Sequence, residues 1–228
     1  MVIKKGFIMK WSELRSKCRR ESDYIITLFI TNEVSLFITW LLLKTRVTPN
    51  QVTVASLFCG VLCGLLYLSG WFITGSFFLF LSHVLDCTDG NLARAKEVFS
   101  TFGRWLDFVG DKIADIFIFL CVSLFFFKNQ DSTIWIILPI LDALLLMLYY
   151  YIVDVALSLG ISKTKQEITS LRFKGVHVKW GLLEPVIYGF IILASLGFIK
   201  IQITLLFFIV IFGLIYQIIK NYFLYKSS

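Results

Sequence analysis

The sequence has little charge for its length. Only 16% of its 228 residues are Asp, Glu, Lys or Arg, whereas 58% are hydrophobic and 23 are Phe. A soluble domain carries about a quarter charged residues, so this composition excludes an ordinary soluble protein and predicts a multispanning membrane protein. No short apolar stretch with a small-residue cleavage site precedes the first long apolar segment, and we expect no removable signal peptide.

Residues that bind zinc are also scarce. The chain has two histidines, His83 and His177, and five scattered cysteines. Neither histidine completes a spacing that would hold zinc, so we interpret the cysteines as packing residues. The basic residues lie on membrane loops, not in a stripe interleaved with exposed aromatic residues, which argues against nucleic-acid binding.

Six apolar stretches are long enough to cross about 30 Å of hydrocarbon at about 1.5 Å per residue. They lie near 51–69, 72–94, 103–127, 132–159, 180–198 and 201–223. A seventh candidate, 24–44, is interrupted by Asn32 and Glu33. Because a charge at bilayer depth costs several kcal/mol, this segment is a poor span.

The positions of Lys and Arg favour six spans, because basic residues accumulate in cytoplasmic loops. If 51–69 enters from the cytoplasm, residues 1–46 place nine basic residues on that side, and the opposite face has only Lys128 and Lys200. We therefore expect 24–44 to be an amphipathic helix in the cytoplasmic interface, with both termini and the active site cytoplasmic.

The predicted fold class is an all-α membrane protein with six transmembrane helices and an N-terminal amphipathic interfacial helix. Residues 1–46 would form the cytoplasmic tail and the interfacial helix, and residues 47–225 the six-helix domain. No internal repeat divides the chain further.

Five aspartates lie within thirty residues whose flanks are almost purely apolar: Asp86, Asp89, Asp107, Asp111 and Asp115. The first two are three residues apart and the others are four apart, so each set follows one face of its helix. The two helices are consecutive, antiparallel and joined by a short loop. The first four aspartates should therefore converge just under the cytoplasmic surface.

Four carboxylates this close would repel one another and lose hydration, and they can stay ionised only with cations among them. Oxygen ligands favour Mg²⁺, Mn²⁺ or Ca²⁺ over zinc. Two such ions about 3.5–4 Å apart can hold a diphosphate during displacement at phosphorus. Gly90 and Gly103 remove side chains where a ligand must approach the backbone, and Arg94 offers a forked donor to phosphate.

Residues 86–111 read Asp-x2-Asp-Gly-x2-Ala-Arg-x8-Gly-x3-Asp-x3-Asp. This string resembles the signature of the CDP-alcohol phosphotransferase family at every fixed position and in both gaps. The stretch Thr-Pro-Asn-Gln-Val-Thr at 48–53 also resembles the segment that opens the first span in many members. The resemblance covers roughly residues 20–225.

The resemblance implies an enzyme that uses two Mg²⁺ or Mn²⁺ ions to transfer a substituted phosphate from a CDP-linked donor to an alcohol and release CMP. Asp86, Asp89, Asp107 and Asp111 would bind the metals, and Asp111 would also be the general base. The CMP site would comprise Asp89, Gly90, Ala93, Arg94, Gly103, Asn50 and Thr53. We expect CDP-diacylglycerol as donor, a role in phospholipid synthesis, and a homodimer.

The acceptor alcohol is less constrained. A candidate acceptor or phosphate pocket comprises Lys112, Asp115, Arg172, Lys174, His177 and Glu184. A polar acceptor such as an inositol phosphate would suit it, although the basic residues at 160–180 are equally explained as a positive-inside loop. A soluble CDP-alcohol with a lipid acceptor is the alternative within the same chemistry.

Two other classes of protein were weighed. A cation channel or carrier would place acidic residues at several depths and often has repeated halves, whereas here the acids cluster and no repeat is visible. A non-catalytic scaffold would not need the complete aspartate set. The sequence therefore favours the enzyme.

Overall fold

The computed structural model describes residues 10–20, 22–161, 167–173, 176–180 and 182–227. Helices dominate this part of the chain, and η1 and η2 are π-helical segments. The elements in order are α1 (Trp11–Lys17), β1 (Ser22–Tyr24), η1 (Thr27–Thr31), α2 (Asn32–Leu42), α3 (Pro49–Leu68), α4 (Phe72–Lys96), α5 (Thr101–Lys128), α6 (Thr133–Ser158), β2 (Glu167–Phe173), β3 (Val176–Trp180), α7 (Leu183–Gly189), η2 (Phe190–Ala194) and α8 (Ile199–Ser227).

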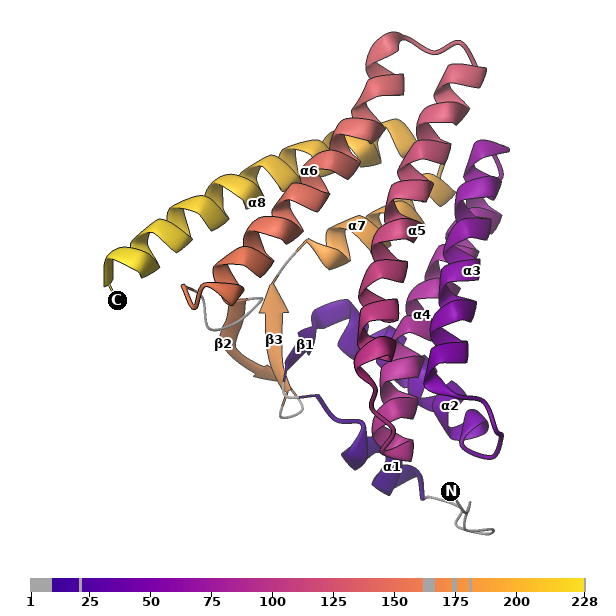
Figure 1. Ribbon diagram of the computed structural model, residues 1–228. Coiled ribbons are helices and arrows are strands. Elements are labelled where there is room, and N and C mark those ends of the chain that lie inside the picture. Colours follow the sequence, from indigo (N-terminus) through magenta and orange to yellow (C-terminus); the bar gives the residue numbers. More distant parts are fainter. Residues whose placement is uncertain (1–9, 21, 162–166, 174–175, 181, 228) are drawn as a thin grey trace.

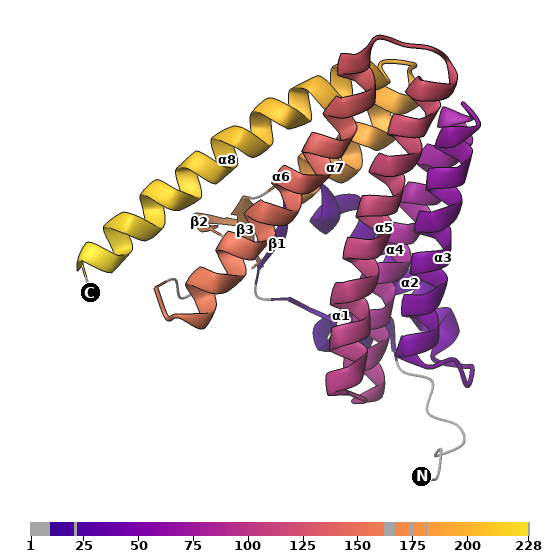
Figure 2. The same ribbon diagram turned by 45° about the horizontal axis from the view of Figure 1, so that its top comes forward.

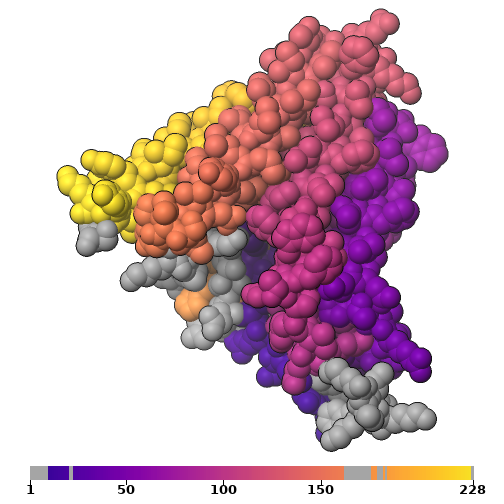
Figure 3. All heavy atoms as spheres, viewed as in Figure 1, coloured from indigo at the N-terminus to yellow at the C-terminus, as the bar shows by residue number. Residues whose placement is uncertain are grey.

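The long helices form two groups. Helices α3, α4 and α5 run side by side, whereas α6 and α8 lean away from them (Figure 1), and the turned view shows the same division (Figure 2). A continuous apolar core joins the groups at one end, with Tyr67, Phe119, Leu146, Phe190 and Leu206 almost fully buried. At the other end α5 and α6 separate. Part of the N-terminal segment, which comprises α1, β1, η1 and α2, is visible between them (Figure 3).

Three of the described helices, α3, α6 and α8, are long and apolar enough to cross a membrane. Helices α4 and α5 are also long but carry the charged motif. Large apolar side chains point outward, among them Phe77 at 60% and Phe212 at 70% exposure, as expected of a surface in contact with lipid. The chain is an integral membrane protein, and the count of six spans stays a prediction.

Segment 24–44 folds as η1 followed by α2, with Tyr24 outside them in β1. Its hydroxyl residues Thr27, Thr31, Ser35 and Thr39 are four apart and buried against the bundle. Its large apolar side chains, such as Phe37 at 54%, are exposed instead. This inverted pattern suits a helix at a membrane interface, whose polar stripe contacts protein and whose apolar face contacts lipid.

The all-α expectation was incomplete, because the chain also contains a small sheet in the order β1-β3-β2. Strand β1 pairs in parallel with β3, and β2 pairs with β3 in the antiparallel sense. The sheet ties residues 22–24 of the N-terminal segment to the loop that follows α6. Strand β1 has only three residues, too few for an alternating pattern to reveal, and it pairs with a strand more than 150 residues away. Helix α1 was not predicted either.

Helices α3 and α5 approach closely at Gly60. A Cβ atom added to Gly60 would lie 2.9 Å from the Cβ of Ala114, closer than real Cβ contacts. A Cβ added to Gly110 on α5 would meet nothing within 4 Å. Gly60 therefore sets the distance between the two helices, whereas Gly110 does not.

We expect Gly60→Ala to lower thermal stability although alanine favours helix, because overpacking costs about 1–3 kcal/mol and the propensity gain is about 1 kcal/mol or less. The measurement is the Tm of the purified protein in detergent. Gly110→Ala is the matched control and should leave Tm unchanged or raise it slightly. An equal response of both variants would contradict the close approach.

Candidate active site

The connection between α4 and α5 brings the two halves of the aspartate motif together. Helix α4 ends at Lys96 and is capped by Glu97, which adopts a left-handed conformation with φ 57°. Helix α5 begins after Ser100, whose Oγ accepts a hydrogen bond of 2.8 Å from the Gly103 N–H and so caps the helix. Only residues 97–100 separate the helices, so the last turns of α4 face the first turns of α5.

Three motif aspartates meet across this pair of helices. Carboxylate oxygens of Asp86, Asp89 and Asp107 lie within 4.8 Å of one another. Asp89 is buried at 6% exposure, and Oδ1 of Asp107 is buried with no hydrogen-bond partner among the described residues. Oxygen ligands at this spacing, one of them unpaired, fit a divalent cation such as Mg²⁺ or Mn²⁺.

Asp111 lies one helical turn beyond Asp107 and is exposed. Its carboxylate interacts electrostatically with Asp86, Asp89 and Asp107. The fourth aspartate thus belongs to the same charged cluster but remains accessible. This is the position from which a carboxylate can serve both a cation and a substrate hydroxyl.

Helix α3 supplies the residues that position the cluster from the side. Thr53 Oγ1 donates a hydrogen bond of 2.5 Å to Oδ2 of Asp89. Asn50 is held at the first turn of α3, where a capping box between Thr48 and Gln51 starts the helix. A Cβ on Gly103 would lie 2.7 Å from Oδ1 of Asn50, so the head of α5 needs glycine to sit against α3.

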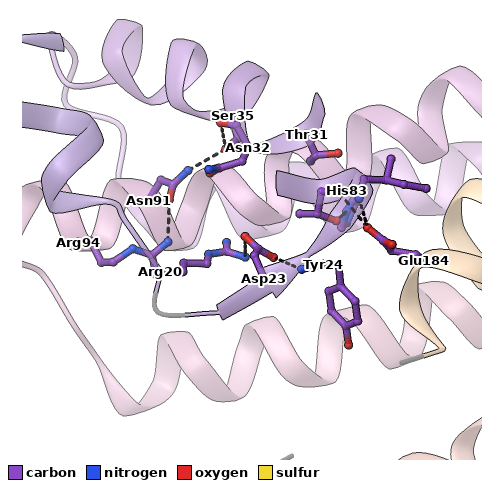
Figure 4. A network of polar contacts seen from close by, with 12 residues as sticks. Arg20, Asp23, Tyr24, Thr31, Asn32, Ser35, His83, Asn91, Arg94 and Glu184 are labelled. Carbon is purple, nitrogen blue, oxygen red and sulfur yellow. Dashed lines mark hydrogen bonds and ion pairs between the residues drawn. The ribbon is translucent and has the colours of Figure 1, made fainter. Parts of the chain in front are cut away.

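Arg94 is oriented by residues that the sequence analysis did not identify (Figure 4). Its Nη2 donates a hydrogen bond of 2.7 Å to Oδ1 of Asn91, and Nδ2 of Asn91 donates one of 2.7 Å to Oγ of Ser35 on α2. Nε of Arg94 is buried and has no partner among the described residues. An oriented guanidinium with an unused donor is suited to bind a phosphate oxygen.

Arg20 is a second arginine near the cluster. It pairs with Asp23 at 3.5 Å and also interacts with the Cys87 thiol and the Asp86 carboxylate. Burial lowers the pKa of Arg20, but these interactions outweigh burial and raise the pKa above its ordinary value. The N-terminal segment therefore adds a permanent positive charge near the aspartate cluster.

His83 lies one turn before Asp86 and faces the N-terminal segment. Its Nε2 is 3.3 Å from Oγ1 of Thr27, and its ring contacts that of Tyr188. His83 also belongs to a group with Asp86 and Cys87 whose ligand atoms lie within 4.8 Å of one another. Its hydrogen bond links α4 to the N-terminal segment.

The residues expected for the acceptor pocket contact different partners. Lys112 Nζ lies 3.6 Å from the Asp115 carboxylate and 3.5 Å from the centre of the Tyr150 ring. Oε1 of Glu184 accepts hydrogen bonds from the backbone N–H groups of Ile26 and Thr27, so this carboxylate holds the N-terminal segment.

The remaining acceptor candidates belong to the segment after α6. Arg172 lies in β2 with its backbone opposite His177 in β3. Nδ1 of His177 is buried without a hydrogen-bond partner in the part of the chain that the structure describes. Lys174 lies outside the described residues.

Gly90 and Ala93, which were expected in the CMP site, lie on the described part of α4, within the motif.

Sequence reasoning missed Arg20, Ser35 and Asn91. Asn91 occupies a variable position of the motif string, and the other two lie in the N-terminal segment. One signal was present, since the hydroxyl residues of segment 24–44 recur every four positions. A polar stripe on an otherwise apolar helix indicates the face that contacts protein.

A model of the family described as CDP-alcohol phosphatidyltransferase matches residues 46–226. Over 95 residues the chain is 35% identical to "Phosphatidylinositol phosphate synthase" of Cutibacterium acnes, a match that covers 41% of this chain and 46% of that protein. The matched segment thus spans about half the length of that relative.

Solved structures of phosphatidylinositol phosphate synthase from Mycobacterium tuberculosis share the fold. The complex with manganese and citrate has a TM-score of 0.66 at 19% identity and covers 85% of this chain and 89% of that chain. The structure with CDP-DAG bound has a TM-score of 0.65 at 20% identity and covers 85% and 94%.

We expect Thr53→Val to weaken metal binding, because it removes the hydroxyl bound to Asp89 while keeping the shape of the side chain. Loss of a group that orients a metal ligand typically costs about 10–100-fold in affinity. The measurement is Mn²⁺ binding followed by electron paramagnetic resonance. Thr53→Ser retains the hydroxyl and is the matched control; a Val variant that binds Mn²⁺ like the Ser variant would refute this role.

Proposed function

Because the chain belongs to the CDP-alcohol phosphatidyltransferase family, and is thus a transferase, we propose that it transfers the phosphatidyl group of CDP-diacylglycerol to a polar alcohol and releases CMP. The observation that carries the proposal is the meeting of Asp86, Asp89 and Asp107 within 4.8 Å. A donor of this kind is supported by the similar fold of a protein with CDP-DAG bound.

The metal ligands in this proposal are Asp86, Asp89, Asp107 and Asp111, which would hold two Mg²⁺ or Mn²⁺ ions. The unpaired Oδ1 of Asp107 and the mutual repulsion of the cluster fit this role. The similar fold crystallised with manganese supports it. When bound, the ions neutralise the charge of the diphosphate.

The chain's own residues then bind and orient the substrates. Arg94 binds phosphate, with its guanidinium held by Asn91. A Cβ on Gly90 would make only ordinary contacts of 3.5 Å or more with Arg94, so the protein itself leaves room at this residue for a ligand. The proposed CMP site is completed by Thr53, Asn50, Ala93 and Gly103.

Asp111 is the general base of the proposed reaction. It is the exposed member of the aspartate cluster, so an acceptor hydroxyl can approach its carboxylate. Asp111 takes the hydroxyl proton as the alcohol oxygen bonds to the phosphorus bearing the diacylglycerol ester. CMP leaves with the electrons of the broken P–O bond.

We propose a phosphorylated polar alcohol, such as an inositol phosphate, as acceptor. The relative in Cutibacterium acnes supports this choice, as do Lys112 and His177. The buried, unpaired Nδ1 of His177 and the Lys112 ammonium are groups that can interact with a phosphate. The proposal also includes six membrane spans and a homodimer, and it places both termini and the active site on the cytoplasmic side.

The experiment that tests the function is CMP release by the purified protein with Mg²⁺. Donors are CDP-diacylglycerol and CDP-choline, each offered with inositol phosphate, glycerol 3-phosphate, serine and diacylglycerol. We expect release only with CDP-diacylglycerol and a phosphorylated alcohol, complete loss after chelation, and recovery with Mg²⁺ or Mn²⁺. Release from CDP-choline with diacylglycerol would overturn the donor assignment, and activity in metal-stripped protein would overturn the metal assignment.

We expect Asp111→Asn to lower kcat for CMP release by about 100-fold or more, since a general base contributes about 100- to 10,000-fold. Asp131→Asn is the control, because Asp131 pairs with Lys200 at the other end of α5 and should leave kcat unchanged. Tm values near that of the wild type would show that both variants fold. Full activity of the Asp111 variant would exclude it as the base.

A further inference from the structure

A cavity of about 350 Å³ lies among α1, β1 and the start of α2, with Val176 of β3 at its edge. Of the residues described at the active site, only Arg20 and its partner Asp23 are among those that line it. Its charged residues come from the N-terminal segment: Arg15, Arg19, Arg20, Asp23 and Glu33. Hydroxyl and amide groups of Ser12, Ser16 and Asn32 complete its polar wall.

The charges of this cavity favour an anion. Among the described residues that line it, three guanidinium groups accompany two carboxylates, which gives this lining one net positive charge. Arg15 pairs with Glu33, and Arg20 pairs with Asp23 at the long distance of 3.5 Å. The Arg15–Glu33 pair is exposed and contributes little to stability, so an anion can replace Glu33 as the partner of Arg15 at little cost.

We propose that this cavity binds a phosphate group through Arg15, Arg19 and Arg20. A phosphate offers several acceptor oxygens in the geometry that guanidinium donors match, and the serine hydroxyls and the Asn32 amide supply further donors. The group is distinct from the diphosphate of the donor. It belongs either to a soluble phosphorylated alcohol or to the headgroup of an anionic lipid. The lipid is a candidate because α2 presents its apolar face outward beside the cavity.

Two contacts connect the cavity to the active site. Arg20, in the wall of the cavity, interacts with Cys87 and electrostatically with Asp86. Cys18, which also lines it, donates a hydrogen bond of 3.4 Å to the carbonyl oxygen of Asn91, the residue that orients Arg94. A phosphate in the cavity therefore acts on the same residues that position the metal ligands and the donor phosphate.

The test uses full-length protein stripped of metal, in neutral detergent and without any CDP-linked donor. Without metal the aspartate cluster repels anions and disfavours phosphate binding at the active site, and a requirement for Arg19 assigns the response to the cavity. We expect phosphate to raise the Tm of the wild type. Because a hydrogen bond to a charged group contributes about 1.5–3 kcal/mol, Arg19→Gln should weaken phosphate binding at least about 10-fold.

Two further variants separate the cavity from general charge effects. Arg46→Gln removes an exposed arginine between α2 and α3 and should respond to phosphate like the wild type. Ser16→Phe removes no charge but fills the cavity, and should lose the response as Arg19→Gln does. Each variant's own Tm in the absence of phosphate reports whether it folds.

The source of the phosphate is decided by a second arm, in nanodiscs of phosphatidylcholine with or without phosphatidylglycerol. A Tm shift with inorganic phosphate that needs Arg19 supports a soluble ligand. A shift only with phosphatidylglycerol that needs Arg19 supports a lipid headgroup. If Arg19→Gln and the wild type respond equally to both ligands, or if neither responds, the proposal is overturned. Neither readout depends on CMP release, so the outcome of this test is independent of the proposed enzymatic activity.

Discussion

The repulsion among the aspartates of α4 and α5 is the constraint on which the site depends. Carboxylates within 4.8 Å of one another, one of them almost fully buried, are unfavourable unless cations compensate them. The fold holds them there because the short connection at 97–100 fixes α4 against α5 and because Gly60 and Gly103 let α3 pack closely. The bundle is thus arranged to hold a charged cluster that would otherwise separate.

The N-terminal segment is part of this arrangement. Its buried hydroxyl residues contact the bundle, Ser35 holds Asn91, and Asn91 holds Arg94. At its other end, Glu184 holds the backbone of Ile26 and Thr27. Movement of this segment would therefore change the position of Arg94.

Much of the helical framework could be predicted from the sequence. Long apolar stretches imply spanning helices because backbone groups in hydrocarbon must be satisfied within the segment. The family match confirms the resemblance that the aspartate motif indicated. The helical spacing of Asp86, Asp89, Asp107 and Asp111 also sufficed to expect them on facing surfaces, because periodicity is a local property of each helix.

The sheet, helix α1 and the arginine-lined cavity could not be predicted, since each depends on contacts between segments distant in the sequence. Strand β1 is three residues long and is defined only by its pairing with β3. Arg20 reads in the sequence as one of several basic residues, and only the fold places it beside Asp86. The sequence by itself determined the long helices, the aspartate motif and the family, because local spacing encodes them. The tertiary structure alone decided which polar residues orient that motif, because such hydrogen bonds require side chains from separate helices to meet at one point.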